Sequence, residues 1–327
     1  MKGFNILFTS SGRRVSLIRH FKETMKALKI KGVIVSADML KTAPASFVAD
    51  FQEVIPPAGH PSYVHILKEI CIRHQIKLLI PLIDTELGVL SKFKEEFRII
   101  GVTILVSSPE TTEICFDKRN TDAFLRSVGV RTPEMIYFNK NSDNTHLRYP
   151  LLIKPAFGSG SNGGVKIKNA RELEFFLSYV KDPIVQEFIF GDEYTLDVLV
   201  DFQGKVRCVV PRLRIETRAG EVSKGITVKN YEIMFTGQKV AENLPGALGC
   251  ITVQLFLTFE GQIKVTEINP RFGGGIPLSI QAGADYPRWI LQMMLGENPM
   301  IEFDGWKDRA VMLRYDDAIF LTRDMIL

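Results

Sequence analysis

The sequence has little cysteine, and the cysteines that it has are scattered. Cys71, Cys115, Cys208 and Cys250 form no C-x-x-C pair, so neither a zinc site nor a disulfide framework is indicated. No apolar run approaches the ~20 residues of a membrane-spanning helix, and the apolar stretch at residues 4–8 is too short for a signal-peptide core. We therefore expect a cytoplasmic protein with no membrane partner.

An excess of one charge is also missing. The net charge of +4 over 327 residues is mild and gives no reason to expect nucleic acid as a partner. A hydrophobic content of 46% and a charged content of 24% are ordinary for a globular protein, and this length suits two or three domains. The sequence contains no internal repeat and no low-complexity segment.

The first third of the chain alternates predicted strands and helices. The predicted strands are residues 5–9, 32–38, 51–55, 77–81 and 102–106, and the predicted helices are 15–27, 62–74 and 86–97. This alternation predicts a doubly wound parallel sheet, in which ligands gather at the carboxyl ends of the strands. Asp84 and Glu86 lie at such an end, where helix capping explains them better than ligand contact.

After about residue 150 the pattern becomes mostly β. The predicted strands there are residues 151–154, 165–168, 184–189, 194–201, 205–215, 225–228, 250–259 and 262–268, with a terminal pair at 311–315 and 318–321. The predicted helices are residues 117–128, 171–180, 232–243, 278–282 and 287–295, with another opening at Pro109. The second part of the chain is therefore expected to be α+β.

The segment at residues 263–275, Ile-Lys-Val-Thr-Glu-Ile-Asn-Pro-Arg-Phe-Gly-Gly-Gly, says most about function. Glu267 and Asn269 are two residues apart, so on a strand both side chains leave the same face. Gln254, on a neighbouring apolar strand, offers a third oxygen. Such oxygens beside Arg271 suit Mg²⁺ bound to phosphate. Taken alone, a strand end closed by an Asn-Pro turn with a solvated Glu267 explains the segment equally well.

A glycine-rich loop at residues 158–163 fits the letters G-x-G-x-x-G, but a strand pattern follows it instead of a helix. It is therefore not a dinucleotide fingerprint. A β-hairpin with a glycine-rich tip is typical of loops that fold over nucleotide phosphates, where backbone N–H groups such as those of Gly160 and Ser161 donate hydrogen bonds. Lys154, just before Pro155, adds a point charge. A plain surface hairpin is the alternative.

The predicted strand at residues 184–189 suits an adenine slot. Backbone groups beside Glu187 would bond the edge of the base, and Phe188 or Ile189 would pack on its face. Glu193, a few residues later, could accept hydrogen bonds from ribose hydroxyls. Either carboxylate could instead be an exposed strand residue, the usual outcome for a lone glutamate.

Taken in order, these elements resemble the ATP-grasp superfamily, and most closely a single synthetase half of the carbamoyl-phosphate synthase large subunit, from about Lys118 to Gly296. The resemblance rests on Asp117-Lys118-Arg119, Leu152-Ile153-Lys154-Pro155, the glycine loop, Gln186-Glu187-Phe188-Ile189, Asp192-Glu193-Tyr194, Val253-Gln254-Leu255 and Glu267-Ile268-Asn269-Pro270-Arg271. It implies two α+β lobes that clasp ATP, with the glycine loop as a mobile lid.

The resemblance also implies residue roles. Lys118 and Lys154 would bind the phosphates of ATP. Glu187, Phe188 and Ile189 would frame adenine, and Glu193 would take the ribose. The Mg²⁺ ligands, which would also accept Mn²⁺, would be Gln254, Glu267 and Asn269.

The implied chemistry is carboxylate–amine ligation. A carboxylate attacks the γ-phosphorus of ATP, Lys154 and the metal offset the developing charge, and an amine then displaces phosphate from the acyl phosphate. Arg271 would hold the acyl-phosphate oxygens, because its guanidinium is planar and bidentate. The five histidines lie outside the nucleotide motifs and receive no catalytic role. A phosphotransferase and a non-catalytic nucleotide-binding module are the alternatives.

The chain has one synthetase half and no glutaminase motif, so we do not expect it to make carbamoyl phosphate alone. Small-molecule acid and amine substrates are expected, and a homodimer is common among enzymes of this type. Arg218 and Lys224, in a charged segment, are candidates for binding a substrate carboxylate, although a solvated loop explains them equally well. The expected domains are residues 1–112 (Rossmann-like), 113–188 (small lobe with the lid) and 189–327 (large lobe with the metal site).

Overall fold

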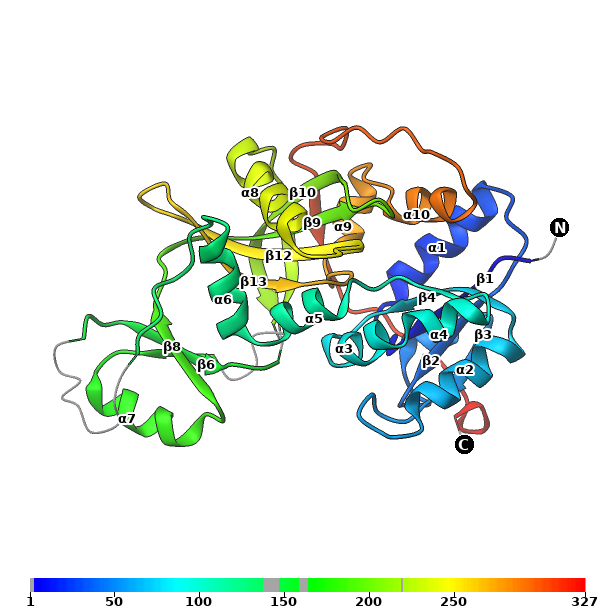
Figure 1. Cartoon of the computed structure of the whole chain (residues 1–327), viewed down its shortest axis with the longest axis horizontal. Helices are drawn as coiled ribbons and strands as arrows, with labels where there is room; N and C mark the ends of the chain where they lie inside the picture. The colour runs from blue at the N-terminus through cyan, green and yellow to red at the C-terminus, as the bar shows by residue number, and fades with distance from the viewer. Residues whose placement is uncertain (1–2, 138–146, 159–163, 219, 327) are drawn as a thin grey trace.

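The computed structural model describes residues 3–137, 147–158, 164–218 and 220–326, and three sheets organise them (Figure 1). A five-stranded sheet and a three-stranded unit lie at opposite ends of the molecule, with a six-stranded sheet between them. Across these residues, none of the helices combines the length and apolar character that crossing a bilayer requires.

The five-stranded sheet has the order β3-β2-β1-β4-β5, and all its neighbouring strands pair in parallel. Its strands are β1 Asn5–Thr9, β2 Ile34–Asp38, β3 Phe51–Val54, β4 Ile76–Pro81 and β5 Thr103–Ile104. Its helices are α1 Val15–Ala27, α2 Tyr63–Arg73, α3 Asp84–Lys92 and α4 Lys94–Ile99, with the 3-10 helix η1 Pro44–Val48. The single helix predicted at residues 86–97 is thus two, because Phe93 ends α3 and caps α4.

Side chains of β1 alternate between two hydrophobic clusters, which confirms that this sheet is covered on both faces. Ile6 and Phe8 are buried in the cluster that contains α1, whereas Leu7 is buried in the cluster formed with α2, α3 and α4. Successive side chains of a strand point to opposite faces, so helices on both sides require apolar residues at every position.

The six-stranded sheet is antiparallel and has the order β13-β12-β9-β10-β11-β14. Its strands are β9 Gly191–Val200, β10 Val206–Arg218, β11 Glu221–Thr227, β12 Gly249–Thr258, β13 Ile263–Asn269 and β14 Val311–Leu313. The remaining helices of this part are α5 Pro109–Phe116, α6 Lys118–Ser127, α8 Tyr231–Asn243, α9 Ile276–Gln281, α10 Tyr286–Met294 and the 3-10 helix η2 Arg323–Met325.

Two sequence predictions about this sheet were wrong. The segment at residues 218–224 is a tight hairpin between β10 and β11 and not an open loop, since the strands pair as far as Arg218 and Glu221. The terminal strand pair is also absent from the described residues. β14 pairs with β11, where Lys224 lies opposite Leu313, and residues 318–321 form no strand. β14 pairs with the edge of β11 that lies away from β10. The two strands are far apart in sequence, so the local sequence does not reveal the pairing.

The three-stranded unit has the order β7-β6-β8 and a hydrophobic cluster of its own. Its elements are β6 Leu151–Pro155, β7 Val165–Ile167, α7 Ala170–Tyr179 and β8 Pro183–Glu187. Ile153 and Ile167 on the sheet pack with Leu173 of α7 in this cluster. β8 ends at Glu187, two residues earlier than predicted, so Phe188 and Ile189 follow the strand.

The five-stranded and six-stranded sheets share one continuous core. Helix α1 packs against α9 and α10, and the cluster around it extends into β9, β10 and β12. Phe21 of α1 meets Phe8 edge-on at 5.1 Å between ring centroids and meets Phe272 at 6.1 Å. Phe272 follows Arg271, so this packing fixes the segment after β13 against the N-terminal sheet.

Candidate functional site

The end of β13 carries the predicted metal ligands, and β12 supplies the third. Gln254 lies directly opposite Glu267, and Thr252 lies opposite Asn269. A register shift between Gln254 and Leu255 disturbs the strand at this point, which is common where a sheet edge aims side chains at a site. The structure therefore brings all three oxygen-bearing side chains to one end of a strand pair.

These three side chains fit a hard divalent cation that also binds phosphate. Within the described residues, no three His, Cys, Asp or Glu side chains gather as a metal cage would require. The set has one carboxylate, from Glu267, and two amides. Asn269 is buried and its Nδ2 has no hydrogen-bond partner in the part of the chain that the structure describes, so the amide is free to turn its oxygen outward. One carboxylate balances one of the two positive charges of Mg²⁺ and leaves the other to be balanced by substrate phosphates, as Mg²⁺ sites commonly do.

Arg214 of β10 contacts this set. Its Nη1 donates a hydrogen bond to Gln254 Oε1 at 3.3 Å and forms an ion pair with Glu193. To bind a cation, the side-chain oxygen of Gln254 would have to break this long hydrogen bond with Arg214. Burial raises the pKa of Glu193, although Arg214 opposes the effect. Glu193, which we predicted to bind ribose, lies inside β9 and is held there by its ion pair with Arg214.

Lys154 and Lys118 both lie near enough to Glu267 for its charge to act on their pKa values. Lys154 lies near the end of β6, and burial lowers its pKa to about 8, opposed by Glu267 and reinforced by Lys118. Burial also lowers the pKa of Lys118, and Glu267 and Asp84 oppose that shift. Both lysines thus lie near Glu267, and in the free protein the nearby carboxylates do not offset the cost of burying the two ammonium groups. Such a site suits an anionic ligand.

The glycine loop meets Lys118 at its base. Lys118 Nζ donates a hydrogen bond to the carbonyl oxygen of Gly158 at 2.7 Å, and Gly158 has a φ of +99°. Gly160 and Ser161 lie outside the described residues. The contact with Gly158 places the start of the loop beside the two lysines.

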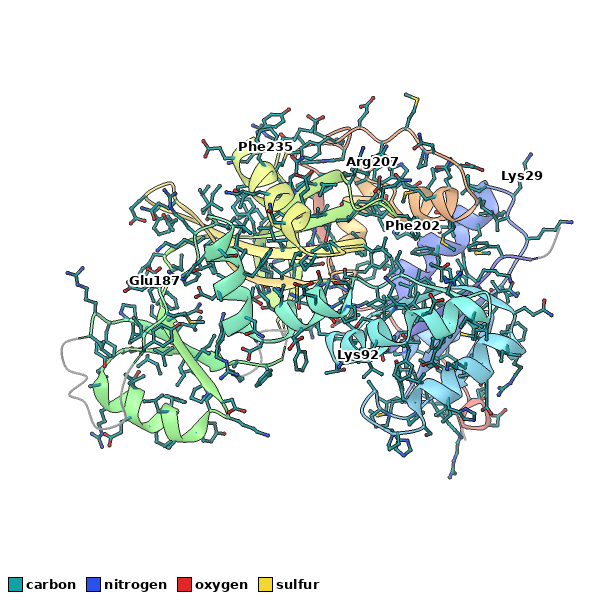
Figure 2. All side chains as sticks on the ribbon, in the orientation of Figure 1. Lys29, Lys92, Glu187, Phe202, Arg207 and Phe235 are labelled. Atoms are coloured by element: carbon teal, nitrogen blue, oxygen red, sulfur yellow. The ribbon has the colours of Figure 1, made fainter. Side chains whose placement is uncertain are left out.

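The predicted adenine residues lie at the junction between the three-stranded unit and the six-stranded sheet, where Figure 2 labels Glu187. The Glu187 carboxylate accepts hydrogen bonds from Lys264 of β13 and from the backbone N–H of Glu134 at 2.8 Å. The Phe188 ring lies under Lys166 Nζ at 4.2 Å and meets Phe190 edge-on at 5.2 Å. Ile189, half-buried, precedes β9. Their role in binding adenine stays a prediction.

Arg271 makes a contact that was not predicted. Its Nη2 donates to Asp84 Oδ2 at 2.8 Å, and its Nε has no partner among the described residues. Asp84 opens α3, so this ion pair joins the N-terminal domain to the end of β13. The capping prediction is confirmed for Glu86, whose carboxylate accepts the N–H groups of Leu82 at 2.8 Å and Ile83 at 3.2 Å.

The three glycines after Phe272 make room for arginines of the protein. A Cβ on Gly274 would lie 2.5 Å from Arg14 Nη1, and one on Gly275 would lie 2.1 Å from Arg212 Nη1. Arg212 is buried and forms a bidentate ion pair with Asp197 at 2.7 and 3.0 Å. At these two glycines the space beside the backbone is therefore taken by arginine side chains.

Arg218 and Lys224 are already paired. Arg218 Nη1 lies 2.8 Å from Asp316 Oδ2, and Lys224 Nζ lies 2.7 Å from Glu216 Oε2, with all four side chains exposed. The substrate role predicted for these two residues would require both pairs to open. It stays a prediction, and the structure offers better-placed cations, described below.

Family models match both parts of the chain. A PylC-like N-terminal domain matches residues 6–105, and an ATP-grasp domain matches residues 115–275. The chain is an ATP-grasp protein. The fold class predicted for an ATP-grasp domain behind a parallel-sheet domain is thereby confirmed.

The relatives include ligases and synthetases. The carbamoyl phosphate synthase large chain of Clostridium perfringens is 24% identical over 229 residues, which cover 64% of this chain but 21% of that protein. A D-alanine–D-alanine ligase of Fusobacterium nucleatum is 25% identical over 187 residues, covering 54% of this chain and 64% of the ligase. This ATP-grasp chain thus spans about one fifth of the first of these relatives.

A solved structure covers nearly the whole chain. The biotin carboxylase domain of Hydrogenobacter thermophilus 2-oxoglutarate carboxylase, determined with MgADP, ADP and bicarbonate, aligns with a TM-score of 0.73 at 17% identity. The alignment covers 95% of this chain and 74% of that one. At this identity the match establishes the shared fold.

Proposed function

We propose that this chain is a Mg²⁺-dependent ligase that uses ATP to convert a carboxylate to an acyl phosphate, which an amine then attacks. The products are an amide, ADP and phosphate. One observation carries the proposal: Lys118 and Lys154 converge on Glu267, whose strand also presents Asn269 and faces Gln254. The names of the relatives, a D-alanine–D-alanine ligase among them, favour the same chemistry.

The residues of the chain supply binding and charge, and no side-chain nucleophile is needed. Lys154 and Lys118 would neutralise the phosphates as the carboxylate attacks the γ-phosphorus. Gln254, Glu267 and Asn269 would hold a divalent cation, which would offset the negative charge of the phosphates. Arg271, oriented by Asp84, would hold the oxygens of the acyl phosphate.

Hydroxylamine trapping tests the first half-reaction without knowledge of the amine. The purified chain is incubated with ATP, Mg²⁺, hydroxylamine and a panel of carboxylic acids, and hydroxamate, ADP and phosphate are measured. A ligase forms hydroxamate in proportion to ADP with its own acid. ADP formed with a stable phosphorylated product would indicate a phosphotransferase, and nucleotide binding without turnover with any acid would indicate a regulatory module. Either outcome would overturn the proposal.

The remaining assignments of the enzyme are also proposals. We infer small-molecule substrates, Mg²⁺ as the ion with Mn²⁺ in its place, and a homodimer as the assembly. Adenine would be framed by Glu187, Phe188 and Ile189, and Glu193 would bind ribose once Arg214 releases it. We also infer that residues 1–112, 113–188 and 189–327 act as the three domains of the enzyme.

A further inference from the structure

A cavity of about 970 Å³ opens between the N-terminal domain and the β10–β11 hairpin. Its walls come from the start of α1, from η1, from α9, and from the C-terminal segment that begins with β14. Its volume lies at the upper end of the ~300–1,000 Å³ of small-molecule sites. Building on the proposed function, we propose that this cavity binds the amine substrate, and that Arg13 and Arg19 bind a second, anionic group on that amine.

The cavity lies directly beside the segment that follows Arg271. Glu221 lines the cavity, and its carboxylate Oε1 is 2.9 Å from the position of a Cβ on Gly274. Arg14 Nη1 lies 3.4 Å from the same oxygen. These two side chains therefore connect the lining of the cavity to Gly274. An amine at this end of the cavity would therefore lie next to the acyl phosphate.

Glu221 places one carboxylate among the arginines at this end of the cavity. Burial raises the pKa of Glu221, but Arg14 and Arg314 lower it by more, so the carboxylate stays ionised. Arg314 Nη1 lies 3.2 Å from Glu221 Oε2. The carboxylate side chain is 30% exposed and can accept a hydrogen bond from a substrate ammonium in addition to its two ion pairs.

Arg13 and Arg19 are the arginines of the cavity lining that form no hydrogen bond or close ion pair within the described part of the chain, although Arg13 lies near enough to Glu221 to lower the pKa of that carboxyl. The other two arginines of its lining are paired, Arg218 with Asp316 and Arg314 with Glu221. Arg19 lies one turn beyond Val15 on α1, about 6 Å along the helix axis. Guanidinium groups bind carboxylate or phosphate in a bidentate manner, so both are suited to hold an anion.

The rest of the lining is largely apolar, which suits a substrate with a hydrophobic body. The apolar residues include Val15, Phe47, Val222, Leu278, Met312 and Leu321. The cavity thus offers a carboxylate beside the glycine segment, two arginines at and just before the start of α1, and apolar walls around them. Its complement is an amine that carries an anionic group, such as an amino acid.

The reaction balances without a further reagent. The ammonium loses one proton, and the nitrogen lone pair attacks the acyl carbon. The bond from that carbon to the phosphate oxygen breaks, and phosphate leaves with the electron pair. The departing phosphate takes up the second proton of the nitrogen and becomes hydrogen phosphate.

Matched pairs of amines test the inference, with the acid that gives hydroxamate. ADP release is measured with leucine against 3-methylbutylamine, phenylalanine against 2-phenylethylamine, and phosphoethanolamine against ethanolamine, so that carboxylate and phosphate are distinguished. We expect the anionic member of at least one pair to be used with a KM at least tenfold lower. The double variant Arg13→Gln/Arg19→Gln should remove that preference and leave hydroxamate formation unchanged. Lys26→Gln, on the exposed face of α1, is the matched control.

Equal use of both members of every pair, or no use of any of these amines while hydroxylamine is still used, would overturn the inference. So would a double variant that alters the KM of the acid and not that of the amine. A wild-type enzyme that forms no hydroxamate with any acid contradicts the proposed function itself, and the inference fails with it.

Discussion

Arg271 and Asp84 form an ion pair, with 2.8 Å between Nη2 and Oδ2, across 187 residues of sequence. Arg271 follows the strand that carries Glu267 and Asn269, whereas Asp84 opens a helix of the N-terminal domain. Both side chains are largely buried, at 11% and 16% exposure, so the contact holds the guanidinium in one orientation. The N-terminal domain therefore contributes directly to the geometry of the proposed active site.

Asp84→Asn should lower turnover while leaving ATP affinity nearly unchanged. Arg271 loses its charged partner and no longer holds the acyl-phosphate oxygens in place, which we expect to reduce kcat on the order of 10- to 100-fold. Steady-state ADP release and equilibrium nucleotide binding separate the two effects. Glu95→Gln, which removes an exposed ion pair of α4, is the control. Unchanged kcat in Asp84→Asn would mean that Arg271 needs no positioning.

Glu267→Gln should abolish turnover and remove the effect of Mg²⁺ on nucleotide affinity. Glu267 is the one carboxylate of the proposed cation site, so we expect a loss on the order of 10²- to 10³-fold in kcat. Calorimetric titration with ADP, with Mg²⁺ and with a chelator, measures the second effect. Glu260→Gln at the tip of the same hairpin should behave as wild type. Mg²⁺ that tightens ADP binding equally in both variants would exclude Glu267 as a ligand.

Nucleotide affinity should fall as the pH rises through about 8. Lys154 has a pKa of about 8 in the free protein, so it is an ammonium below that pH and becomes neutral above it. Each pH unit above 8 should weaken ATP binding by up to about tenfold until the remaining contacts dominate. The dissociation constant is measured from pH 6.5 to 9.5. Lys154→Met should bind weakly and independently of pH, and a flat wild-type profile would contradict a phosphate role for Lys154.

Gly275→Ala should destabilise the fold. The added Cβ would lie 2.1 Å from Arg212 Nη1 and 2.6 Å from Val222 Cγ1, so the buried ion pair with Asp197 must shift. We expect the free energy of unfolding to fall by about 1–3 kcal/mol, as for overpacked cores. Gly88→Ala on α3 meets no atom within 4 Å and should be neutral or slightly stabilising. Equal melting temperatures for both variants would show that the segment adapts without cost.

Local patterns predicted most of the elements to within one or two residues, because the period of apolar residues and the turn residues are local properties. β1 and α1 have the predicted bounds, and Gln254 faces Glu267 because both belong to one hairpin. Contacts between segments that are distant in sequence could not be predicted. The pairing of β14 with β11 and that of Arg271 with Asp84 depend on how the domains pack, which no local period encodes.

The same limit applies to Arg218. Asp316, its partner in an exposed ion pair, lies 98 residues away in sequence, and the substrate role of Arg218 stays a prediction. Residues 10–14, which include Arg13, lie at the carboxyl end of a predicted strand, where ligands gather, but no motif marks Arg19, because a single arginine on a helix is common on surfaces. The cavity that they face exists only once the C-terminal segment folds back against α1.

The continuous packing of α1 against α9 and α10 has a consequence for engineering this enzyme. Phe21 touches Phe8 on one side and Phe272 on the other, so grafting a foreign N-terminal domain would expose apolar surface on both partners at once. The three-stranded unit, with its own cluster around Ile153 and Leu173, is the piece that could be transplanted between homologues. A change of substrate is therefore better sought by redesigning individual residues of the α1 face than by swapping modules.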